Sequence, residues 1–558
     1  MYIYHTVRYD TSSALFLPTT TNDDDARRAR NLLRFCSNLL VNHSSCLSTK
    51  MGFLVPVGRN SARNLSKRML YDRASGWRRN QSLSALPFST TNASASATDE
   101  TDILIVGGGV VGCALVRLLN ARMPHLTVGL VEAGTGPRPV EADSLPNPRS
   151  YALSPASLEL LGLHDNYKDD AVRKRLGFYN SMQVWESHQP ASLLFTETDL
   201  PESTSHLGAV VEDALLVDCL WTEIAKSECR VWKETTVGNI FPPASALDPW
   251  CQVELQSTAV DGSPAVRPKI ATKLLVAADG ANSHVRRILG LSTAGWDYGQ
   301  QALTFTVALN APHAGRAFQR FSENGVMALL PTWSPNHAVV VWSTSPGTVK
   351  EWKDNPNLVS HVNSLLQQGP GQLGPLFGED NGTPSIFNNL KYGAEQLINT
   401  VQYSASMMAQ QNMGQFVAPP VIAETVSPQF AFPLSCRQVN NYIQPRVALV
   451  GDAAHSVHPM AGQGLNLGLQ DVANLVDVIE QGVTSGMDPT TFLHEYDRSR
   501  KAQVSLTISG IHTLHQVFGV QDTLAKHVKS LGMNMIQNIG PLRRSLVHAA
   551  CQGVARPE

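Results

Sequence analysis

The sequence predicts an α/β (α+β) fold with three parts: a Rossmann-like nucleotide-binding domain, a β-sheet domain interleaved with it, and a helical C-terminus. Three observations predict this fold. The stretch Thr101–Glu132 reads as strand, glycine-rich turn, helix and strand. Short β-like runs separated by turns fill the middle of the chain, from Ala302 to Ser343. From Gly464 onward, apolar residues recur at helical spacing.

The first of these stretches carries a dinucleotide-binding pattern. An apolar run, Ile103–Val106, suits a buried parallel strand, and it leads into Gly107–Gly112, which matches G-x-G-x-x-G. A helical stretch and a second strand, Thr127–Val131, follow, and that strand ends in Glu132. This order of strand, turn, helix, strand and acid is the context in which the glycine pattern indicates nucleotide binding. A glycine-rich turn without a ligand is the alternative, and the complete frame disfavours it.

Each glycine of the pattern has an expected purpose. Gly107 allows the tight turn, and Gly109 lets a pyrophosphate approach the backbone at a helix N-terminus, where N–H groups and the helix dipole favour negative charge. Gly112 lets the helix and the strand touch. Glu132 can accept hydrogen bonds from both hydroxyls of a ribose, and an acid there disfavours a 2′-phosphate.

Composition limits the class of protein. The chain has 558 residues, of which 43% are hydrophobic, so a sizeable core and about three or four domains are possible. Its net charge of −2 gives no indication of nucleic-acid binding. The eight cysteines include no C-x-x-C pair, which favours a reducing compartment over a disulfide framework or zinc site. No apolar run is long enough to span a membrane, so we expect any membrane contact to be peripheral.

Residues 1–100 are predicted to be a transit segment and linker, largely disordered. From Met51 to Thr98 the chain is rich in arginine and serine, and Asp72 is its one acid. This composition is typical of a mitochondrial or plastid transit segment. The run Asp23–Asp25 opposes import, so Met51 is an alternative start to Met1. A disordered tail without a targeting role is the other interpretation.

Two later segments also end a strand and lead towards a helix. Lys269–Ala278 runs into Asp279-Gly280, and Val447–Val450 runs into Gly451-Asp452. In an open α/β sheet, such strand ends meet at the carboxyl edge, where ligands bind. One nucleotide would then be held at both ends, with Asp452 accepting from ribityl hydroxyls. Backbone N–H groups near Gly462 and Gly464 would stabilise negative charge on a flavin at its N1–C2=O atoms.

The remaining elements follow from periodicity and turn residues. Ser154-Pro155 is a plausible helix start, and Gly369–Gly374 matches G-x-G-x-x-G without a preceding strand, so we interpret it as a loop. Trp342 is expected in the core or on a sheet face, and Cys113 is expected to pack in its helix. Helices are expected at Glu212–Lys226, Thr348–Gln368 and Leu390–Met413, and strands at Val231–Val237, Cys251–Ser257, Ala302–Leu309, Arg316–Ser322, Val326–Pro331, Ala338–Ser343 and Phe430–Leu434.

The expected division of the chain follows these elements. The nucleotide-binding domain is predicted in two pieces, 101–297 and 436–500. The substrate domain is predicted at 298–435, with an insertion at 383–425, and C-terminal helices are predicted at 501–558.

The three strand–turn segments, in this order, resemble the aromatic-ring flavin hydroxylases of the p-hydroxybenzoate hydroxylase fold. The stretches Gly315–Pro331, Val340–Thr344 and Gly451–Asn466 resemble the ubiquinone-biosynthesis branch of flavin-dependent monooxygenases, which includes mitochondrial ring C5-hydroxylases. The resemblance runs from about Asp102 to the C-terminus, and the last stretch is the most specific. It implies a Rossmann-like FAD-binding domain whose site positions are Gly107, Gly109, Gly112, Glu132, Arg149, Asp279, Asp452, Gly462, Gly464 and Asn466.

This resemblance also implies a reaction. Reduced FAD would add O₂ to give a C4a-hydroperoxide, whose distal oxygen is transferred to ring C5 of a polyprenylated phenol intermediate in ubiquinone biosynthesis. Because the flavin carries the chemistry, no catalytic side chain and no metal is predicted. His455 and His458 are expected in packing or loop roles. The strands in Gly315–Pro331 are expected to wall the substrate cavity.

Further expectations come from the mitochondrial branch. Electrons would arrive from ferredoxin and ferredoxin reductase, and other ubiquinone-biosynthesis proteins would be partners in a membrane-associated complex. The expected location is the matrix side of the mitochondrial inner membrane, peripherally bound. The tail before Met51 departs from the family pattern, and the insertion at 383–425 is longer than in bacterial relatives. Two alternatives remain open: an FAD hydroxylase or epoxidase of another substrate, and a catalytically silent lipid-binding member of the fold.

Overall fold

The computed structural model describes residues 99–141, 143–163, 169–186, 191–200, 204–243, 245, 248–257, 269–322, 325–371, 416–459, 462–519 and 523–552. The chain divides into Met1–Ser96 and Ala97–Glu558, and every described residue lies in the second unit. The predicted transit segment, up to residue 98, and the helix predicted at Leu390–Met413 lie outside the described residues.

The first sheet contains the strands that the apolar runs predicted. β1 pairs in parallel with β2 on one side and with β11 on the other, and β11 pairs in parallel with β19. β9 and β10 form an antiparallel extension on β11. From edge to edge the main order is β18 (Ile443–Gln444), β19 (Val447–Leu449), β11 (Lys269–Ala277), β1 (Asp99–Val106), β2 (Val128–Val131) and β8 (Arg230–Trp232), with β9 at Thr235–Phe241 and β10 at Cys251–Ser257.

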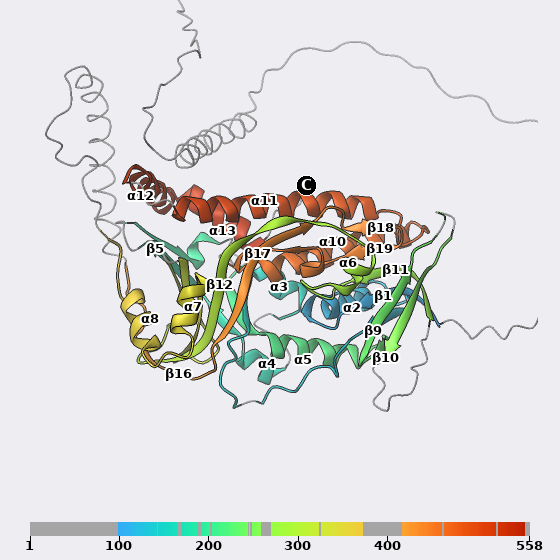
Figure 1. Ribbon diagram of the computed structural model, residues 1–558, viewed down its shortest axis with the longest axis horizontal. Helices are drawn as coiled ribbons and strands as arrows, with labels where there is room; N and C mark the ends of the chain where they lie inside the picture. Colours follow the sequence, from blue (N-terminus) through green and yellow to red (C-terminus); the bar gives the residue numbers. More distant parts are fainter. Residues whose placement is uncertain are drawn as a thin grey trace, which may run out of the picture. The chain divides into compact units, whose positions relative to one another are not determined.

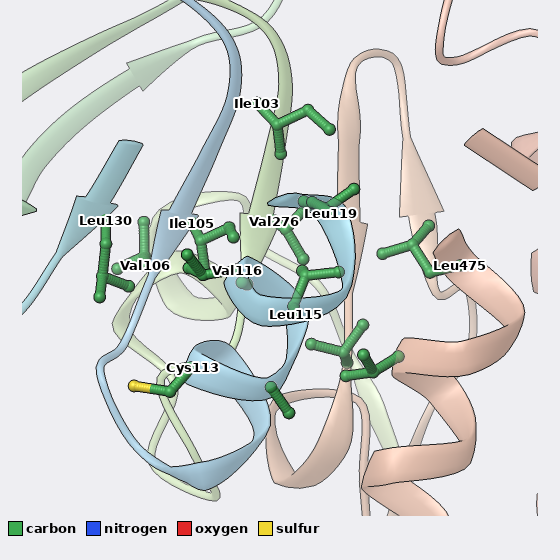
Figure 2. Close-up of a cluster of buried hydrophobic side chains, with 14 of the residues drawn as sticks. Ile103, Ile105, Val106, Cys113, Leu115, Val116, Leu119, Leu130, Val276 and Leu475 are labelled. Atoms are coloured by element: carbon green, nitrogen blue, oxygen red, sulfur yellow. The ribbon is translucent and has the colours of Figure 1, made fainter. Parts of the chain in front are cut away.

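The core of this half lies between that sheet and three helices. α2 (Val110–Arg122) packs against both α5 (Asp213–Ile224) and α10 (Gly464–Thr484). Figure 2 shows side chains from β1, β2, β11, α2 and α10 meeting in one buried apolar cluster. Ile103–Val106 is buried throughout because this strand has neighbours on both edges and helices on its face.

The second sheet is mixed, with mostly antiparallel pairs. β13 pairs antiparallel with β14 but parallel with β5. In Figure 1, β12 and β17 lie side by side although they are far apart in sequence. The order is β20 (His455–Ser456), β17 (Phe430–Val439), β12 (Thr293–Leu309), β15 (His337–Thr344), β14 (Gly325–Pro331), β13 (Arg316–Ser322), β5 (Ser181–Glu186) and β6 (Ser192–Thr196), and β16 (Ile422–Thr425) pairs with β12.

Several predicted elements differ in extent from the observed ones, including the strand predicted at Phe430–Leu434, which continues to Val439 as β17. β12 starts nine residues before the predicted strand, because Thr293–Gln301 is held by pairing with β17 and not by an apolar pattern of its own. The helix predicted at Thr348–Gln368 is two helices, α7 (Pro346–Trp352) and α8 (Leu358–Leu366), because Asp354 has a φ of 65° and Pro356 follows. The strand predicted at Val231–Val237 divides at Glu234, whose φ is 51°.

α7 and α8 cover one face of the second sheet. Leu303, Phe305 and Trp342 on that face belong to a buried cluster with residues of both helices, so Trp342 is a core residue, as expected. The predicted insertion at 383–425 lies mostly outside the described residues, but its last four residues form β16 and are part of the sheet.

A small third sheet and a helical C-terminus complete the described residues. The third sheet has the order β3 (Ser150–Leu153), β7 (Gly208–Glu212) and β4 (Gly177–Tyr179), and α3 (Pro155–Leu160) begins at the predicted cap, Ser154. The C-terminal helices are α11 (Leu493–Gly519), α12 (Thr523–Asn538) and α13 (Gly540–Gln552), and short helices lie at α4 (Asp170–Lys174), α6 (His284–Ile288), η1 (Glu197–Asp199) and η2 (Gly451–Ala453). Among the described residues, no helix is both long and apolar enough to cross a membrane.

Candidate functional site

The three predicted strand ends lie next to one another. β1, β11 and β19 are consecutive parallel strands, so the turns that follow them leave the same edge of the sheet. A Cβ atom built on Gly468 of α10 would come within 3.0 Å of the Val111 side chain and 3.1 Å of the Gly451 Cα atom. The first turn of α2, the turn after β19 and the start of α10 are therefore in direct contact.

The tight turn expected at Gly107 and the close contact of helix and strand expected at Gly112 are both seen. Gly107 has a φ of +110°, and a Cβ atom there would lie 2.4 Å from the carbonyl oxygen of Ala278 at the end of β11. A Cβ atom on Gly112 would lie 1.9 Å from the carbonyl oxygen of Gly107 and 3.3 Å from the Ala278 Cβ atom. Both positions require glycine because backbone atoms fill the space.

Two other glycines leave open space. A Cβ atom on Gly109 or Gly464 would meet no heavy atom within 4 Å. These residues begin α2 and α10, and neither N-terminus has a side-chain cap from the described residues. The helices α3, α4, α6 and α7 are capped by Ser154, Asp169, Ser283 and Ser345, whereas α5 and α8 also lack a side-chain cap within the described part of the chain. Uncapped N–H groups beside open space fit the phosphate and carbonyl oxygens of a flavin dinucleotide.

Glu132 is held at the end of β2 by the glycine turn. Its carboxylate accepts one hydrogen bond from Gly108 N–H at 2.6 Å and one from Gly134 N–H at 2.7 Å. The Gly108 carbonyl oxygen in turn accepts from the Trp221 indole N–H at 2.9 Å. Each carboxylate oxygen keeps a lone pair for a further donor, as a ribose-binding acid requires.

The two aspartates expected at the site differ in their surroundings. Asp279 Oδ2 accepts from the N–H groups of His284 and Val285, at 2.7 and 3.0 Å, and so caps α6. Its Oδ1 atom is buried and has no partner in the part of the chain that the structure describes. Asp452 has an exposed side chain, but the surrounding protein removes part of the water around its carboxyl group. This desolvation and the nearby charge of Asp471 raise the pKa of that carboxyl group. Each of these aspartates therefore keeps an oxygen available to a cofactor hydroxyl.

Asn466 and Arg149 are already engaged by other residues. Asn466 is buried, and its amide accepts from Ser154 N–H and donates to the carbonyl oxygens of Ala152 and Gly462. It therefore joins β3 to the turn before α10. Arg149 is exposed and its Nε atom lies 3.0 Å from Asp213. Gly462, with a φ of +60°, lies in the turn that Asn466 holds.

The face of the second sheet opposite α7 and α8 carries both polar and apolar side chains. Thr304 and Thr306 donate to the carbonyl oxygens of Pro148 and Pro146, so this face is turned towards the segment before β3. Phe430 lies opposite Thr304 in the pairing of β12 and β17, Phe432 lies opposite Ala302, and both phenylalanines are exposed. We call the part-exposed residues of this face the apolar wall: Ala328, Leu330, Val341, Phe430 and Phe432.

Sequence reasoning missed a buried polar network beneath the site. His455 Nε2 lies 2.6 Å from Asp471 Oδ2, and Arg500 Nε lies 2.6 Å from Asp471 Oδ1. The one local signal was an acid on the apolar face of the helix after Gly464, and its partners come from other elements. His458, expected in a loop role, lies 3.2 Å from Gln300, and Cys113 is buried with its thiol 3.1 Å from the Gly108 carbonyl oxygen.

The fold and this site define a Rossmann-like flavoprotein. The FAD binding domain family matches residues 100–368 and 395–509, and the chain belongs to this family. FAD is therefore its cofactor, and the predicted fold class is confirmed.

The curated relatives include enzymes of ubiquinone biosynthesis. The chain is 29% identical over 462 residues to ubiquinone biosynthesis monooxygenase COQ6, mitochondrial, of Xenopus tropicalis, covering 80% of this chain and 92% of the relative. It is 27% identical over 469 residues to the Homo sapiens protein of that name, covering 81% and 93%. It is 29% identical over 453 residues to 3-demethoxyubiquinol 3-hydroxylase of Escherichia coli strain K12, covering 81% and 98%.

Solved structures share the fold at lower identity. p-Nitrophenol 4-monooxygenase PnpA from Pseudomonas putida DLL-E4 has a TM-score of 0.58 at 17% identity, covering 82% of this chain and 100% of that one. PqsL from P. aeruginosa, in complex with 2-aminobenzoylacetate, has a TM-score of 0.55 at 19% identity, covering 77% and 100%. These similarities establish the fold alone.

Proposed function

We propose that this chain is an FAD-dependent monooxygenase that hydroxylates the aromatic ring of a polyprenylated phenol intermediate in ubiquinone biosynthesis, at ring C5. The observation that carries the proposal is the meeting of three strand ends around uncapped helix N-termini, on a chain whose curated relatives include COQ6 monooxygenases. Bound FAD, once reduced, supplies the O₂ chemistry, and the electron-rich phenol receives one oxygen atom.

The chain's own contribution is to bind, orient and exclude water. The N-terminus of α2 would hold the pyrophosphate, with Glu132 on the ribose and Asp452 on the ribityl chain. The N-terminus of α10 would stabilise negative charge on the flavin ring, by about 0.3–1 kcal/mol and roughly 2 kcal/mol where buried. We assign no side chain to acid–base catalysis.

The apolar wall is the proposed surface for the prenyl chain and ring. Its side chains carry no hydrogen-bonding groups, so they suit an isoprenoid and would keep water from the reacting ring. A non-prenylated aromatic substrate would make little use of exposed Phe430 and Phe432.

The direct test is a single turnover with labelled oxygen. The holoenzyme is reduced anaerobically with dithionite and mixed with ¹⁸O₂ and a geranylated phenol. We expect a ring-hydroxylated product that carries one ¹⁸O atom, with the unprenylated phenol reacting more slowly. Release of hydrogen peroxide without labelled product would overturn the proposal, and equal reaction of both phenols would favour a hydroxylase of another substrate.

We further propose that ferredoxin, reduced by its reductase, is the electron donor, and that other ubiquinone-biosynthesis proteins are partners in a membrane-associated complex. The sequence has no second convincing dinucleotide fingerprint, which agrees with this donor. Rates of flavin reduction by reduced ferredoxin and by NADPH should be compared in one stopped-flow series. Faster reduction by NADPH would contradict the proposed donor.

We also propose a peripheral position on the matrix side of the mitochondrial inner membrane. The mitochondrial relatives and the arginine- and serine-rich composition before Thr98 support an organellar location. The C-terminal helices and the connection between α12 and α13 expose large apolar side chains that suit a membrane surface: Leu506, Leu514, Met535, Ile539 and Leu546. In flotation with cardiolipin-containing vesicles, the wild type should rise with the lipid, and Leu506→Ser/Leu514→Ser should rise less. Equal flotation would contradict this contact surface.

A further inference from the structure

A single buried carboxylate lies behind the turn that carries Asp452. Asp471, on α10, is completely buried, and its two carboxylate oxygens lie within hydrogen-bonding distance of nitrogen atoms from three residues. Oδ2 accepts from Gly451 N–H at 2.8 Å and lies 2.6 Å from His455 Nε2, while Oδ1 accepts from Arg500 Nε at 2.6 Å. A carboxylate in this position can ionise without water because donors surround it.

These contacts join successive elements of the chain between residues 451 and 500. Gly451 begins η2, His455 begins β20, Asp471 lies on α10, and Arg500 lies on α11. Arg500 also donates to the Leu467 carbonyl oxygen at 3.2 Å, in the first turn of α10. Burial alone would raise the pKa of the Asp471 carboxyl group, but the His455 and Arg500 charges hold that pKa below its ordinary value.

The network fixes the residue next to Asp452. Gly451 has a φ of +59°, and a Cβ atom there would lie 3.2 Å from the Val111 side chain at the start of α2. The hydrogen bond from Gly451 N–H to Asp471 sets the orientation of this peptide and thereby of the following carboxylate. Asp452, expected to hold the ribityl chain, therefore depends on Asp471 for its direction.

We propose that Asp471 is a positioning residue for FAD, acting through Gly451 and His455 on Asp452 and on the first turn of α10. Asp471 itself would contact no atom of the cofactor. The inference rests on the FAD cofactor and is independent of the substrate and of the ring position proposed above.

A neighbouring aspartate provides a matched control. Asp497, one turn before Arg500 on α11, accepts from Tyr442 N–H at 2.7 Å and pairs with Lys501 at 2.7 Å. It thus also ties α11 to the segment before β19. Among the described residues, Asp497 makes no hydrogen bond or ion pair with Gly451 or His455, so its loss should lower stability without turning Asp452.

The test compares Asp471→Asn with Asp497→Asn in the full chain. Each apoprotein is titrated with FAD by fluorescence, its unfolding is followed by far-UV circular dichroism, and the midpoint potential of the bound flavin is measured. We expect Asp471→Asn to raise the FAD Kd by about tenfold or more, because a misdirected Asp452 would lose the charged hydrogen bond proposed between its carboxylate and the ribityl chain. We also expect its flavin potential to shift, while Asp497→Asn stays within about twofold of the wild-type Kd.

Two further variants keep the proposal testable if Asp471→Asn does not fold. Arg500→Lys keeps the charge and should retain most of the FAD affinity. His455→Asn removes one contact to Asp471 and should change the flavin potential and the Kd together. Equal stability losses in the aspartate variants with unchanged Kd and potential would overturn the proposal, as would a wild-type Kd and potential in His455→Asn. None of these measurements requires a substrate. Their failure would therefore be distinguishable from a failure of the proposed hydroxylation.

Discussion

Gly112 lies so close to Gly107 that a Cβ atom on Gly112 would come within 1.9 Å of the Gly107 carbonyl oxygen. The obstructing atom belongs to the backbone of the glycine turn, so no side-chain rotation can relieve the overlap. The first turn of α2 and the end of β1 therefore touch only because this position has no side chain.

We expect Gly112→Ala to destabilise the apoprotein by about 1–3 kcal/mol through overpacking, near the upper end because backbone must move. Urea unfolding of the wild type and the variant, both without FAD, measures this difference. A variant as stable as the wild type would mean that α2 and β1 do not approach this closely.

Gly109→Ala should behave in the opposite way. Gly109 has a φ of −75°, which alanine adopts, and a Cβ atom there meets open space. We expect apoprotein stability to change by less than about 0.5 kcal/mol, while FAD binds at least about tenfold more weakly because the pyrophosphate needs that space. Gly510→Ala on α11, whose Cβ also meets open space, is the control and should leave FAD binding unchanged. Unaltered FAD affinity in Gly109→Ala would remove the pyrophosphate from this turn.

His458 should make stability depend on pH in the acid range. Burial and the nearby charge of His515 lower the pKa of His458 to about 4 from 6.5. Between these values the unfolded chain binds a proton that the folded chain does not, so stability falls as the pH drops below 6.5. The loss would reach about 3 kcal/mol near pH 4, and His458→Gln should remove that part of the slope. Parallel curves for wild type and variant, from urea unfolding between pH 4 and 8, would contradict the assignment.

Phe432 should affect the prenylated substrate selectively. Losing a buried contact with a phenylalanine ring costs about 1.5–3 kcal/mol, so we expect Phe432→Ser to raise the KM for a geranylated phenol by about tenfold or more. The KM for the unprenylated phenol should change much less. Phe241→Ser removes an equally exposed ring from β9 of the other sheet and should change neither value. The same rise for both phenols would place the prenyl chain away from the apolar wall.

The parts that sequence predicted well depend on local patterns. β1 was evident from four consecutive apolar residues, and the glycine turn was evident from its frame of strand, helix and acid. The convergence of the turns after β11 and β19 followed from a general rule about parallel sheets, and it is confirmed. The division into domains, with boundaries at 297, 435 and 500, stays a prediction.

The parts that sequence missed depend on distant partners. The first half of β12 has no apolar alternation, and its strand form comes from pairing with β17. Asp471 is a charged residue on a buried helix face, and its contacts with Gly451, His455 and Arg500 explain it. Asn466 stays a predicted cofactor position, and nothing in the sequence indicated that its amide bonds would join β3 to the turn before α10.

The most direct measurement is the stoichiometry and affinity of FAD in Glu132→Ala, Asp452→Ala and the double variant. The central claim is that one FAD extends from the end of β2 to the turn after β19. It predicts one FAD per wild-type chain, and a loss of about 1.5–3 kcal/mol, roughly 10- to 150-fold, from Glu132→Ala. Asp452→Ala should weaken binding of the same molecule and change its visible spectrum. Two FAD molecules per chain, or an Asp452→Ala variant with wild-type affinity and spectrum, would contradict the account.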